Sequence, residues 1–436
     1  MTSKAETVLQ EKIKNRKLKA GIIGLGYVGL PLAVEFAKAG IEVCGIDIDA
    51  RKISSLRQGK SYIQDVPTEE VAELVAEKKL RATTDFSAIR ELDTINICVP
   101  TPLRKSKDPD ISYIVSAAQE IARYFHRGML VILESTTYPG TTEEVIRPML
   151  EEKGFAVGED FFLAFSPERV DPGNPHYQTR NIPKVVGGAT PACTRLAAAF
   201  YELAIAKVHP VSSCASAEMV KLLENTFRSV NIGLVNELCL MSEKLGVDIW
   251  EIIDAAATKP FGFMPFYPGP GLGGHCIPID PHYLAWKARI HGFNPRFIEL
   301  ASAVNAEMPE FVVRKVQAVL NEKGKAVKGA KILILGLSYK KNVDDIRESP
   351  ALEIIELLEK SGAAVSYSDP HVPEISLHGK VYRSVPLASA KKAFDAAILV
   401  TDHAGFDYPS IAKKFPLVLD TRNAFRGIVS EKIKKI

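Results

Sequence analysis

Residues 24–29 read GLGYVG, and they directly follow a short apolar segment, Lys19–Ile23, whose composition predicts a β-strand. A helical pattern comes next and ends at Gly40, after which a second apolar segment, Ile41–Ile46, leads to Asp47. In this arrangement the glycines permit a tight turn, the helix N-terminus offers its amides to a pyrophosphate, and the acid hydrogen-bonds an adenosine ribose. A lone GxGxxG motif is a weak signal, but the complete arrangement predicts a dinucleotide-binding domain.

The acid at position 47 also indicates which dinucleotide is bound. A carboxylate there would repel the 2′-phosphate of NADP, so Asp47 favours NAD. Lys52 lies nearby, and its positive charge tempers that preference slightly. The sequence therefore predicts NAD as the cofactor.

The sheet is expected to continue with two strands, 93–99 and 129–133, which lead into small hydroxylic residues. Ligands of doubly wound sheets bind at the carboxyl ends of the strands, so Thr101 and Thr136 are candidates for the cofactor edge. Capping of the following helix is an equally common role for such residues. A further strand leads to Glu168, whose carboxylate either positions a water molecule or forms a surface salt bridge; the spacing does not separate the two.

A loop rich in glycine and proline, GPGLGGHCIPIDP (269–281), holds the candidate nucleophile. Its four glycines and three prolines set a backbone that neither helix nor strand propensity produces. Cys276, in the middle of the loop, is either a nucleophile or a small buried hydrophobe, and the local sequence leaves both open. Asp280 and Pro281 are typical of the N-cap and first turn of a helix, a role that does not exclude chemistry beside Cys276.

Residues 216–245 show an uninterrupted helical pattern, which at 1.5 Å per residue is roughly 45 Å long. This length is enough to connect two domains, and the apolar stripe along the helix suggests pairing with a second copy of the chain. Lys221 and Asn225 share a polar face that Arg228 extends. Such faces are usually only solvated, but asparagine is a poor mid-helix residue, and a lysine near a site can donate a proton or stabilise an alkoxide. The stripe consists of Met219, Leu222, Leu223, Phe227, Val230, Leu234 and Leu238.

The last part of the chain repeats the opening of the first domain in weakened form. Strands are expected at 331–337, 363–367, 396–400 and 417–419, as in a parallel sheet, but no GxGxxG motif follows the first of them. A different ligand is therefore expected. Basic residues near the strand ends suggest a phosphorylated one, although each of them taken singly is more often merely solvated. These residues are Lys340, Lys341, Arg347 and Arg422.

The bulk composition is that of a soluble globular protein: 436 residues, enough for two or three domains, of which 46% are hydrophobic and 25% charged. A net charge of +3 gives no reason to expect nucleic acid or a membrane surface as a partner, and no apolar run approaches the roughly 20 residues that span a bilayer. The charged N-terminal segment lacks the apolar core of a signal peptide, so a cytoplasmic location is expected. Six scattered cysteines show neither metal-ligand spacing nor a disulfide framework; no metal is predicted, and the five outside the loop are expected to be buried.

Several motifs in order resemble the nucleotide-sugar 6-dehydrogenases of the UDP-glucose/GDP-mannose dehydrogenase superfamily, over essentially the whole chain after about residue 18. They are GLGYVGL (24–30), VPTP (99–102), EST (134–136), FSPE (165–168), EMVKLLENTF (218–227), GGHCIPIDP (273–281) and IRES (346–349). The resemblance implies an α/β fold of two Rossmann-like doubly wound parallel-sheet domains joined by a long central helix. The expected parts are an N-terminal tail (1–18), an NAD-binding domain (19–210), a central helical domain with the cysteine loop (211–310) and a UDP-sugar-binding domain (311–436).

Members of this family oxidise a primary alcohol at C6 of the sugar to a carboxylate in two NAD-dependent steps without releasing the aldehyde. The resemblance makes Cys276 the nucleophile that forms a thiohemiacetal and then a thioester. Lys221, Asn225 and Asp280 would hold oxyanions and an ordered water. Glu168 would assist thioester hydrolysis, and Thr136 would position water. The cofactor residues would be Gly24, Gly26, Tyr27, Val28, Gly29, Asp47, Lys52, Thr101, Thr136 and Arg347. The substrate residues would be Glu168, Arg169, Lys221, Asn225, Tyr267, Gly273, Tyr339, Lys340 and Arg422.

The loop around the cysteine differs from that of the UDP-glucose enzymes, which usually have serine where His275 stands and lysine where Ile279 stands. The form PGPGLGGHCIPIDP (268–281), followed by HYLAWKAR (282–289), resembles the UDP-N-acetylhexosamine branch, so His275 is read as a marker of that branch and not as a general base. UDP-N-acetylglucosamine is therefore the expected substrate, with UDP-N-acetylmannosamine and UDP-glucose as alternatives. A non-catalytic nucleotide-sugar-binding protein is a further alternative, against which the intact set of catalytic residues argues.

Overall fold

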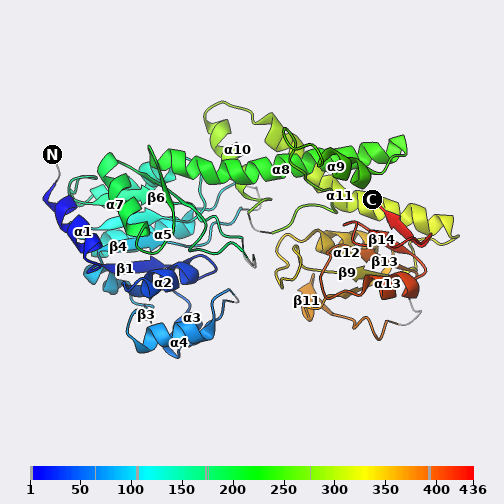
Figure 1. Cartoon of the computed structure of the whole chain (residues 1–436), viewed down its shortest axis with the longest axis horizontal. Helices are drawn as coiled ribbons and strands as arrows, with labels where there is room; N and C mark the ends of the chain where they lie inside the picture. The colour runs from blue at the N-terminus through cyan, green and yellow to red at the C-terminus, as the bar shows by residue number, and fades with distance from the viewer. Residues whose placement is uncertain are drawn as a thin grey trace. The chain divides into compact units, whose positions relative to one another are not determined.

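The computed structural model describes residues 3–63, 65–104, 108–171, 174, 176–274, 276–390 and 394–436. The chain divides into two compact units (Figure 1). The first unit runs to Glu224 and includes His282–Gly292, and the second comprises Asn225–Pro281 and Phe293–Ile436. Each unit is built on one large β-sheet.

The sheet of the first unit has eight strands in the order β3-β2-β1-β4-β5-β6-β7-β8. Neighbouring strands pair in parallel except β6 and β7, which are antiparallel. The order of the first six strands is that of a dinucleotide-binding sheet, which confirms the expected doubly wound fold. The strands are β1 (Lys19–Ile23), β2 (Glu42–Ile46), β3 (Leu80–Thr83), β4 (Thr94–Ile97), β5 (Leu130–Leu133), β6 (Phe162–Phe165), β7 (Lys184–Gly188) and β8 (Val208–Val211).

Helices cover both faces of this sheet because successive strand residues point to opposite sides. On β1, Ile22 joins a core that includes the buried residues of α2, whereas Ile23 joins a second core that includes those of α5. The same alternation divides Ile132 and Val131 of β5 between the two cores. The helices of this unit include α1 (Lys4–Lys14), α2 (Gly29–Lys38), α3 (Ala50–Arg57), α4 (Thr68–Ala76), η1 (Phe86–Glu91), α5 (Ser112–Tyr124), η2 (Thr142–Ile146), α6 (Arg147–Glu151), α7 (Pro191–Tyr201) and most of α10 (Asp280–Ile290).

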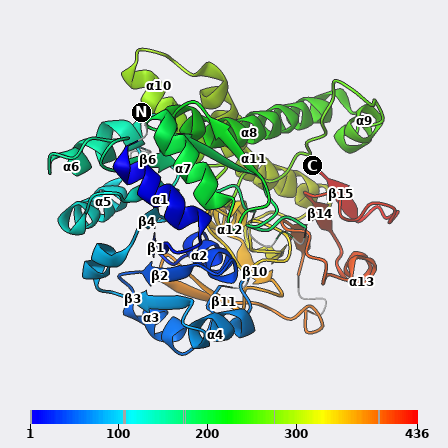
Figure 2. The ribbon, with the colours of Figure 1, turned by 60° about the vertical axis from the view of Figure 1, so that its left-hand side comes forward.

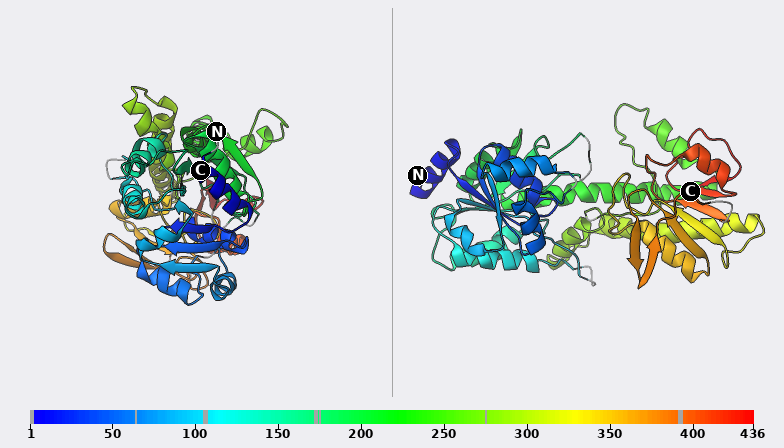
Figure 3. Two further views of the ribbon diagram at one scale, coloured as in Figure 1. Left: turned by 90° about the vertical axis from the view of Figure 1, so that its left-hand side faces the viewer. Right: turned by 90° about the horizontal axis from the view of Figure 1, so that it is seen from below.

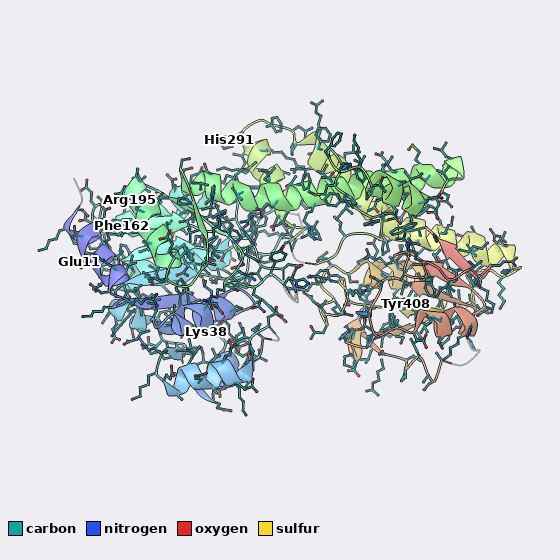
Figure 4. All side chains as sticks on the ribbon, in the orientation of Figure 1. Glu11, Lys38, Phe162, Arg195, His291 and Tyr408 are labelled. Carbon is teal, nitrogen blue, oxygen red and sulfur yellow. The ribbon has the colours of Figure 1, made fainter. Side chains whose placement is uncertain are left out.

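Helix α1 is an element that the sequence pattern does not predict, because its many charges obscure a short apolar face. Leu9 and Ile13 on that face are buried in the core of the first unit, and α1 lies along α7 (Figure 2). Ser3 caps the helix by accepting a hydrogen bond from the amide of Glu6 at 3.1 Å. The carboxylate of Glu6 in turn pairs with Arg195 at 2.7 Å. Figure 4 labels Arg195 on α7.

The second unit contains a five-stranded parallel sheet in the order β10-β9-β13-β14-β15, the other common order of doubly wound sheets. Ile332 of β9 packs in a core with α12, and Leu333 packs on the opposite side in a core with α13. Both Rossmann-like sheets are therefore confirmed. The strands are β9 (Lys331–Leu335), β10 (Ala364–Ser368), β13 (Ala396–Leu399), β14 (Val418–Asp420) and β15 (Ile433–Lys435), with a separate hairpin of β11 (Glu374–Leu377) and β12 (Lys380–Arg383). The helices are α9 (Ile249–Ala256), α11 (Arg296–Glu322), α12 (Pro350–Lys360) and α13 (Tyr408–Lys414).

The first turn of the second sheet repeats that of the first sheet. After β1, Gly24 has φ +91° and donates its amide to the carbonyl of Ile46 at 2.8 Å. After β9, Gly336 has φ +81° and donates its amide to the carbonyl of Ser368 at 2.9 Å. The weak sequence repeat therefore corresponds to a real repeat of backbone geometry.

The acid at the end of the second strand is also repeated, but its surroundings differ. The amide of Leu25 donates to Asp47 at 2.8 Å in the first unit, and the amide of Leu337 donates to Asp369 at 2.6 Å in the second. Among the described residues, only the second acid has a buried imidazole beside it: Nε2 of His403 lies 3.0 Å from Asp369 Oδ2. The two acids therefore occupy equivalent positions but have different hydrogen-bond partners.

Helix α8 (Cys214–Leu245) is one continuous helix of 32 residues that begins slightly before its expected start (Figure 3). Its residues up to Glu224 belong to the first unit and those from Asn225 to the second. In the first unit the buried carboxylate of Glu218 accepts hydrogen bonds from the amides of Gly140 at 2.5 Å and Thr142 at 2.9 Å. This attaches the start of α8 to the segment that follows β5. Within the described part of the chain, no helix has both the length and the apolar character needed to cross a bilayer.

Candidate active site

The three glycines of GLGYVG have different roles in the loop after β1. A Cβ atom added to Gly24 would lie 2.5 Å from the carbonyl oxygen of Cys98, and one added to Gly29 would lie 1.9 Å from that of Gly24. These two glycines are therefore required by the packing of strand, loop and helix. A Cβ on Gly26 would meet no described atom within 4 Å. Gly26 borders open space, as expected where a backbone must approach a pyrophosphate.

Substitutions at these glycines are expected to separate folding from cofactor binding. Gly26→Ala should change the free energy of unfolding by less than about 1 kcal/mol, but weaken NAD binding at least about tenfold, because its methyl group enters ligand space. The matched variant Gly24→Ala should cost about 2–4 kcal/mol of stability, because a positive φ and a clash combine. Thermal unfolding and calorimetric titration with NAD measure both quantities. Equal NAD affinity in Gly26→Ala and the wild type would contradict this assignment.

Asp47 is buried at the end of β2 with several hydrogen bonds. Its Oδ2 accepts from the amide of Leu25 at 2.8 Å and from Nζ of Lys52 at 2.9 Å, and its Oδ1 accepts from the amide of Asp49 at 2.9 Å. At the nearby start of α2, the N-cap residue Val28 provides no side-chain hydrogen bond, so no side chain competes with an anion there. An acid, an uncapped helix and open space at Gly26 together fit NAD, which supplies a hydride acceptor when bound.

The two threonines at the strand ends are not helix caps. The N-cap of α5 is Ile111, and that of η2 is Thr141, so the capping alternative for Thr101 and Thr136 is wrong. Thr101 is buried and its carbonyl accepts a hydrogen bond from the hydroxyl of Tyr283 at 3.0 Å. Thr136 is half-buried and follows β5. Their contact with the cofactor stays a prediction.

Glu168 belongs to a buried ion pair, so the alternative of a surface salt bridge is wrong. Its Oε2 accepts from Nζ of Lys184 at 3.2 Å, and its side chain is only 9% exposed. Its Oε1 accepts from the amides of Arg169 and Val170, both at 2.8 Å. Burial by itself would raise the pKa of Glu168, but the charge of Lys184, the amide of Val170 and the charge of Lys221 outweigh it and lower that pKa. The carboxylate is therefore ionised and held by three donors.

Arg169 forms an ion pair and a hydrogen bond within the first unit. Its Nη2 lies 2.5 Å from Oε1 of Glu224 on α8, and its Nη1 donates to the carbonyl of Pro183 at 2.6 Å. Lys221, one turn before Glu224, is buried at 8% exposure, so it does not lie on a solvated face. Arg228 further along α8 is exposed, as that alternative predicts. The polar face of the helix is thus divided between a buried lysine and a solvated arginine.

The cysteine loop of the second unit carries an exposed thiol. Cys276 is exposed, so the alternative of a buried hydrophobe is wrong, whereas the other five cysteines are buried as expected. The carbonyl of Cys276 accepts from the amide of Asp280 at 2.8 Å, which closes a turn. Asp280 is 1% exposed, and its carboxylate accepts from Nδ2 of Asn225 at 2.6 Å. Asp280 therefore begins α10 and also fixes a polar residue of α8; His275 lies outside the described residues.

Tyr339 and Arg347 lie against the glycines of this loop. A Cβ on Gly273 would be 2.6 Å from Cβ of Tyr339, and one on Gly274, which has φ +86°, would be 2.7 Å from the Tyr339 ring. The amide of Gly274 donates to the carbonyl of Arg347 at 3.0 Å. The guanidinium of Arg347 pairs with Asp345 at 2.6 Å. The glycines thus let the segment after β9 pack directly on the loop.

The remaining candidates of the second unit divide into two groups. Arg422 lies beside the loop, because a Cβ on Gly269 would be 2.6 Å from its Nη1, and burial lowers its pKa. Tyr267 instead contacts α9, where its ring stacks on Trp250 with centroids 5.9 Å apart. Lys340 is half-buried next to Tyr339.

Asn236 is a loop-positioning residue that the sequence argument misses. Its Oδ1 accepts from the amide of Gly269 at 3.0 Å, and its Nδ2 donates to Oδ1 of Asn305 on α11 at 2.8 Å. The glycine loop is thereby attached to α8 and to α11. The signal that singles out Asn225, an asparagine in the middle of a helix, applies equally to Asn236.

Three family models match consecutive parts of the chain. They describe the NAD-binding, central and UDP-binding domains of the UDP-glucose/GDP-mannose dehydrogenase family, and match residues 18–205, 215–307 and 333–427. The first and last contain the two Rossmann-like sheets, apart from a few strands at their edges. The sequence resemblance to this family is therefore confirmed.

Individual relatives of known activity or structure agree with the family models. The chain is 38% identical over 395 residues to UDP-N-acetyl-D-glucosamine 6-dehydrogenase of Pseudomonas aeruginosa, covering 90% of this chain and 92% of the relative. It is 35% identical over 415 residues to UDP-N-acetyl-D-mannosamine dehydrogenase of Pyrococcus horikoshii, covering 94% and 96%. A solved structure of a UDP-D-ManNAc dehydrogenase from that organism superposes with a TM-score of 0.88 at 33% identity, over 96% and 99% of the two chains. The chain belongs to the UDP-glucose/GDP-mannose dehydrogenase family and is an NAD-dependent nucleotide-sugar dehydrogenase.

Proposed function

We propose that the chain oxidises the C6 hydroxyl of a UDP-N-acetylhexosamine to the uronic acid in two NAD-dependent steps. The proposed substrate is UDP-N-acetylglucosamine. The observation that carries the proposal is the exposed thiol of Cys276 in a loop whose backbone is fixed by its own unit. Such a thiol can remain bound to the substrate between the two oxidations, so that the aldehyde is not released.

The candidate residues match the steps that this reaction needs. The thiolate of Cys276 adds to the aldehyde carbon, and Lys221 and Asn225 stabilise the oxyanion that forms. Loss of a hydride from C6 then gives a thioester on the sulfur. Water adds to the acyl carbon, the C–S bond breaks, the thiolate leaves, and Glu168 accepts a proton from the water. Asp280 holds Asn225 in place, as the hydrogen bond of 2.6 Å between them indicates.

In this proposal, different parts of the chain bind the cofactor and the substrate. Residues 19–210 bind NAD and 311–436 bind the UDP group, with the central segment 211–310 supplying Cys276. Tyr339, Lys340 and Arg422 recognise the UDP group, as the charge of the last two suggests. Tyr267 and Gly273 belong to the same substrate set, and Arg347 and Tyr27 complete the cofactor set.

The choice of sugar rests on two supports. The relatives described above act on UDP-N-acetylglucosamine and UDP-N-acetylmannosamine by their names, and the first of them is the more similar in sequence. The loop sequence around Ile279 departs from the UDP-glucose form. UDP-N-acetylmannosamine and UDP-glucose remain the alternative substrates.

Purified protein mixed with NAD and each of the three UDP-sugars tests the proposal by NADH absorbance. Two NADH per sugar, with the highest kcat/KM for UDP-N-acetylglucosamine, are expected. One NADH per sugar would contradict the four-electron reaction. No turnover with any UDP-sugar would support the non-catalytic alternative.

The proposal includes a homodimer formed through α8. The part of α8 in the second unit exposes Phe227, Leu234, Met241 and Leu245, each at 45% or more. The first three are seven residues apart, which is the spacing of a helix seam. Burying such a stripe against a second copy removes apolar surface from water.

Charges on this stripe are expected to separate the two copies. The double variant Leu234→Glu and Met241→Glu should sediment near the chain mass of 47.7 kDa, whereas the wild type should sediment at about twice that mass. Sedimentation velocity at micromolar concentration measures this. A wild-type protein that is already a monomer would exclude pairing through α8.

A further inference from the structure

We propose that Lys184 is a positioning residue for Glu168 during hydrolysis of the thioester, and that Glu134 in turn fixes Lys184. The inference rests on the proposed function, in which Glu168 accepts a proton from the attacking water. It adds two residues, one at the start of β7 and one after β5, that act through Glu168 and not on the substrate.

The three side chains form a continuous chain of ion pairs inside the first unit. Nζ of Lys184 lies 2.5 Å from Oε2 of Glu134 and 3.2 Å from Oε2 of Glu168. The side chains of Glu134 and Lys184 are 0% and 5% exposed, and that of Glu168 is 9% exposed. The chain therefore runs from a completely buried carboxylate to one that retains some access to solvent.

Glu134 is fixed on its other side by neutral donors from two further elements. Its Oε1 accepts from Nδ2 of Asn96 on β4 at 2.8 Å and from the hydroxyl of Tyr201 on α7. The Tyr201 ring also lies 5.3 Å from Nζ of Lys184. Glu134 is buried and hydrogen-bonded on this side, so it can hold the ammonium group of Lys184 at a defined place.

The cluster of Glu134, Lys184 and Glu168 contains two carboxylates and one ammonium group. Lys184 alone would neutralise Glu134, and the additional buried carboxylate is that of Glu168. A buried negative charge is costly unless other groups offset it, and such arrangements occur preferentially at functional sites. The excess is offset by the amides of Arg169 and Val170 and by the charge of Lys221 on α8.

The groups that face Glu168 decide in which direction its pKa responds to mutation. Burial raises this pKa, whereas Lys184 and Lys221 lower it. By Coulomb repulsion, a negative charge on Glu134 acts in the same direction as burial. Cys98, after β4, stays a neutral thiol because burial raises its pKa well above the usual value. Removing the charge of Lys184 therefore raises the pKa of Glu168, and removing the charge of Glu134 lowers it.

A protonated Glu168 cannot accept the proton of the attacking water, so the effect appears in hydrolysis and not in the oxidations. In Lys184→Met we expect a burst of two NADH per site, then turnover at least about tenfold slower than wild type at pH 7, with the acyl-enzyme visible by intact mass spectrometry. In the plot of kcat against pH, the acidic limb should move to higher pH by about one to two units, so that activity recovers in alkaline buffer. Lys184→Arg should restore the wild-type limb.

The variant Glu134→Gln is the second test, and it keeps the inference falsifiable if Lys184→Met does not fold. It should move the acidic limb in the opposite direction, to lower pH, while a purely structural role would leave both limbs in place. Lys12→Met removes an ion pair of 2.6 Å with Asp93 in the same unit and should leave the pH profile unchanged. If the wild type oxidises a UDP-sugar but neither variant moves its limb, Lys184 has no positioning role. If the wild type forms no NADH with any UDP-sugar, the proposed function fails instead.

Discussion

Cys276→Ala is expected to form no uronic acid at a measurable rate, with the rate of acid formation reduced at least about 10³-fold. The variant has no sulfur to hold the aldehyde, so the second oxidation has no thiohemiacetal to act on. The first oxidation needs no thiol, and any aldehyde that it forms should be trapped by hydroxylamine as an oxime. Mass spectrometry of the sugar products measures acid and oxime together.

Iodoacetamide provides a control for this result on the unmodified protein. Because the other five cysteines are buried, Cys276 should be alkylated first, and activity should fall in parallel with its labelling. Acid formation by Cys276→Ala at the wild-type rate would exclude the covalent mechanism. Loss of activity that does not follow the labelling of Cys276 would exclude it as well.

Lys221→Met is expected to lower kcat by about 10²–10³-fold while KM for the UDP-sugar changes by less than about threefold. Lys221 as a whole residue is 8% exposed on α8, and a fixed positive charge in a buried place stabilises an oxyanion more than it would in water. The split between kcat and KM separates this role from simple substrate binding.

The matched control for Lys221→Met is Arg228→Met, which removes an exposed cation from the same helix. Its kcat and its unfolding temperature should both equal those of the wild type. A Lys221→Met enzyme with kcat within about threefold of the wild type would mean that the oxyanion is stabilised by other groups.

The fold could be predicted from the sequence wherever one short segment carries a strong local signal. The GLGYVG segment and its flanking strands determine the first βαβ unit, because turn, helix start and acid must all follow one another there. β8 is not predicted, since Val208 begins a short strand that is half exposed and has no regular alternation. Helix α1 is missed for the opposite reason: Leu9 and Ile13 are buried, but charged neighbours dominate the local pattern.

The candidate site shows a similar division between local and distant information. Cys276 could be identified because a glycine-rich loop is unusual in itself. Lys184 and Glu134 could not, because they are fifty positions apart and look like the ends of ordinary apolar strands. Because β7 pairs antiparallel with β6, its first residue lies at the edge of the sheet where β5 and β6 end, and this brings the two charges together. Pairing across a sheet depends on strand order, which a local pattern does not contain.

The hydrogen bonds of the repeated acid show how two sheets with the same turn differ in the ligand that they suit. Asp369 accepts hydrogen bonds from the amides of Leu337, Ser338, His371 and Val372 in addition to Nε2 of His403. The amide of Asn342 donates to Nδ1 of His403, so Nε2 carries the hydrogen and donates it in the hydrogen bond to Asp369. With every lone pair occupied internally, this carboxylate has nothing left for a ribose hydroxyl. The second sheet thus repeats the turn of the first sheet without an acid that can accept from a ribose. Among the described residues, Asp47 of the first sheet is the acid suited to that contact.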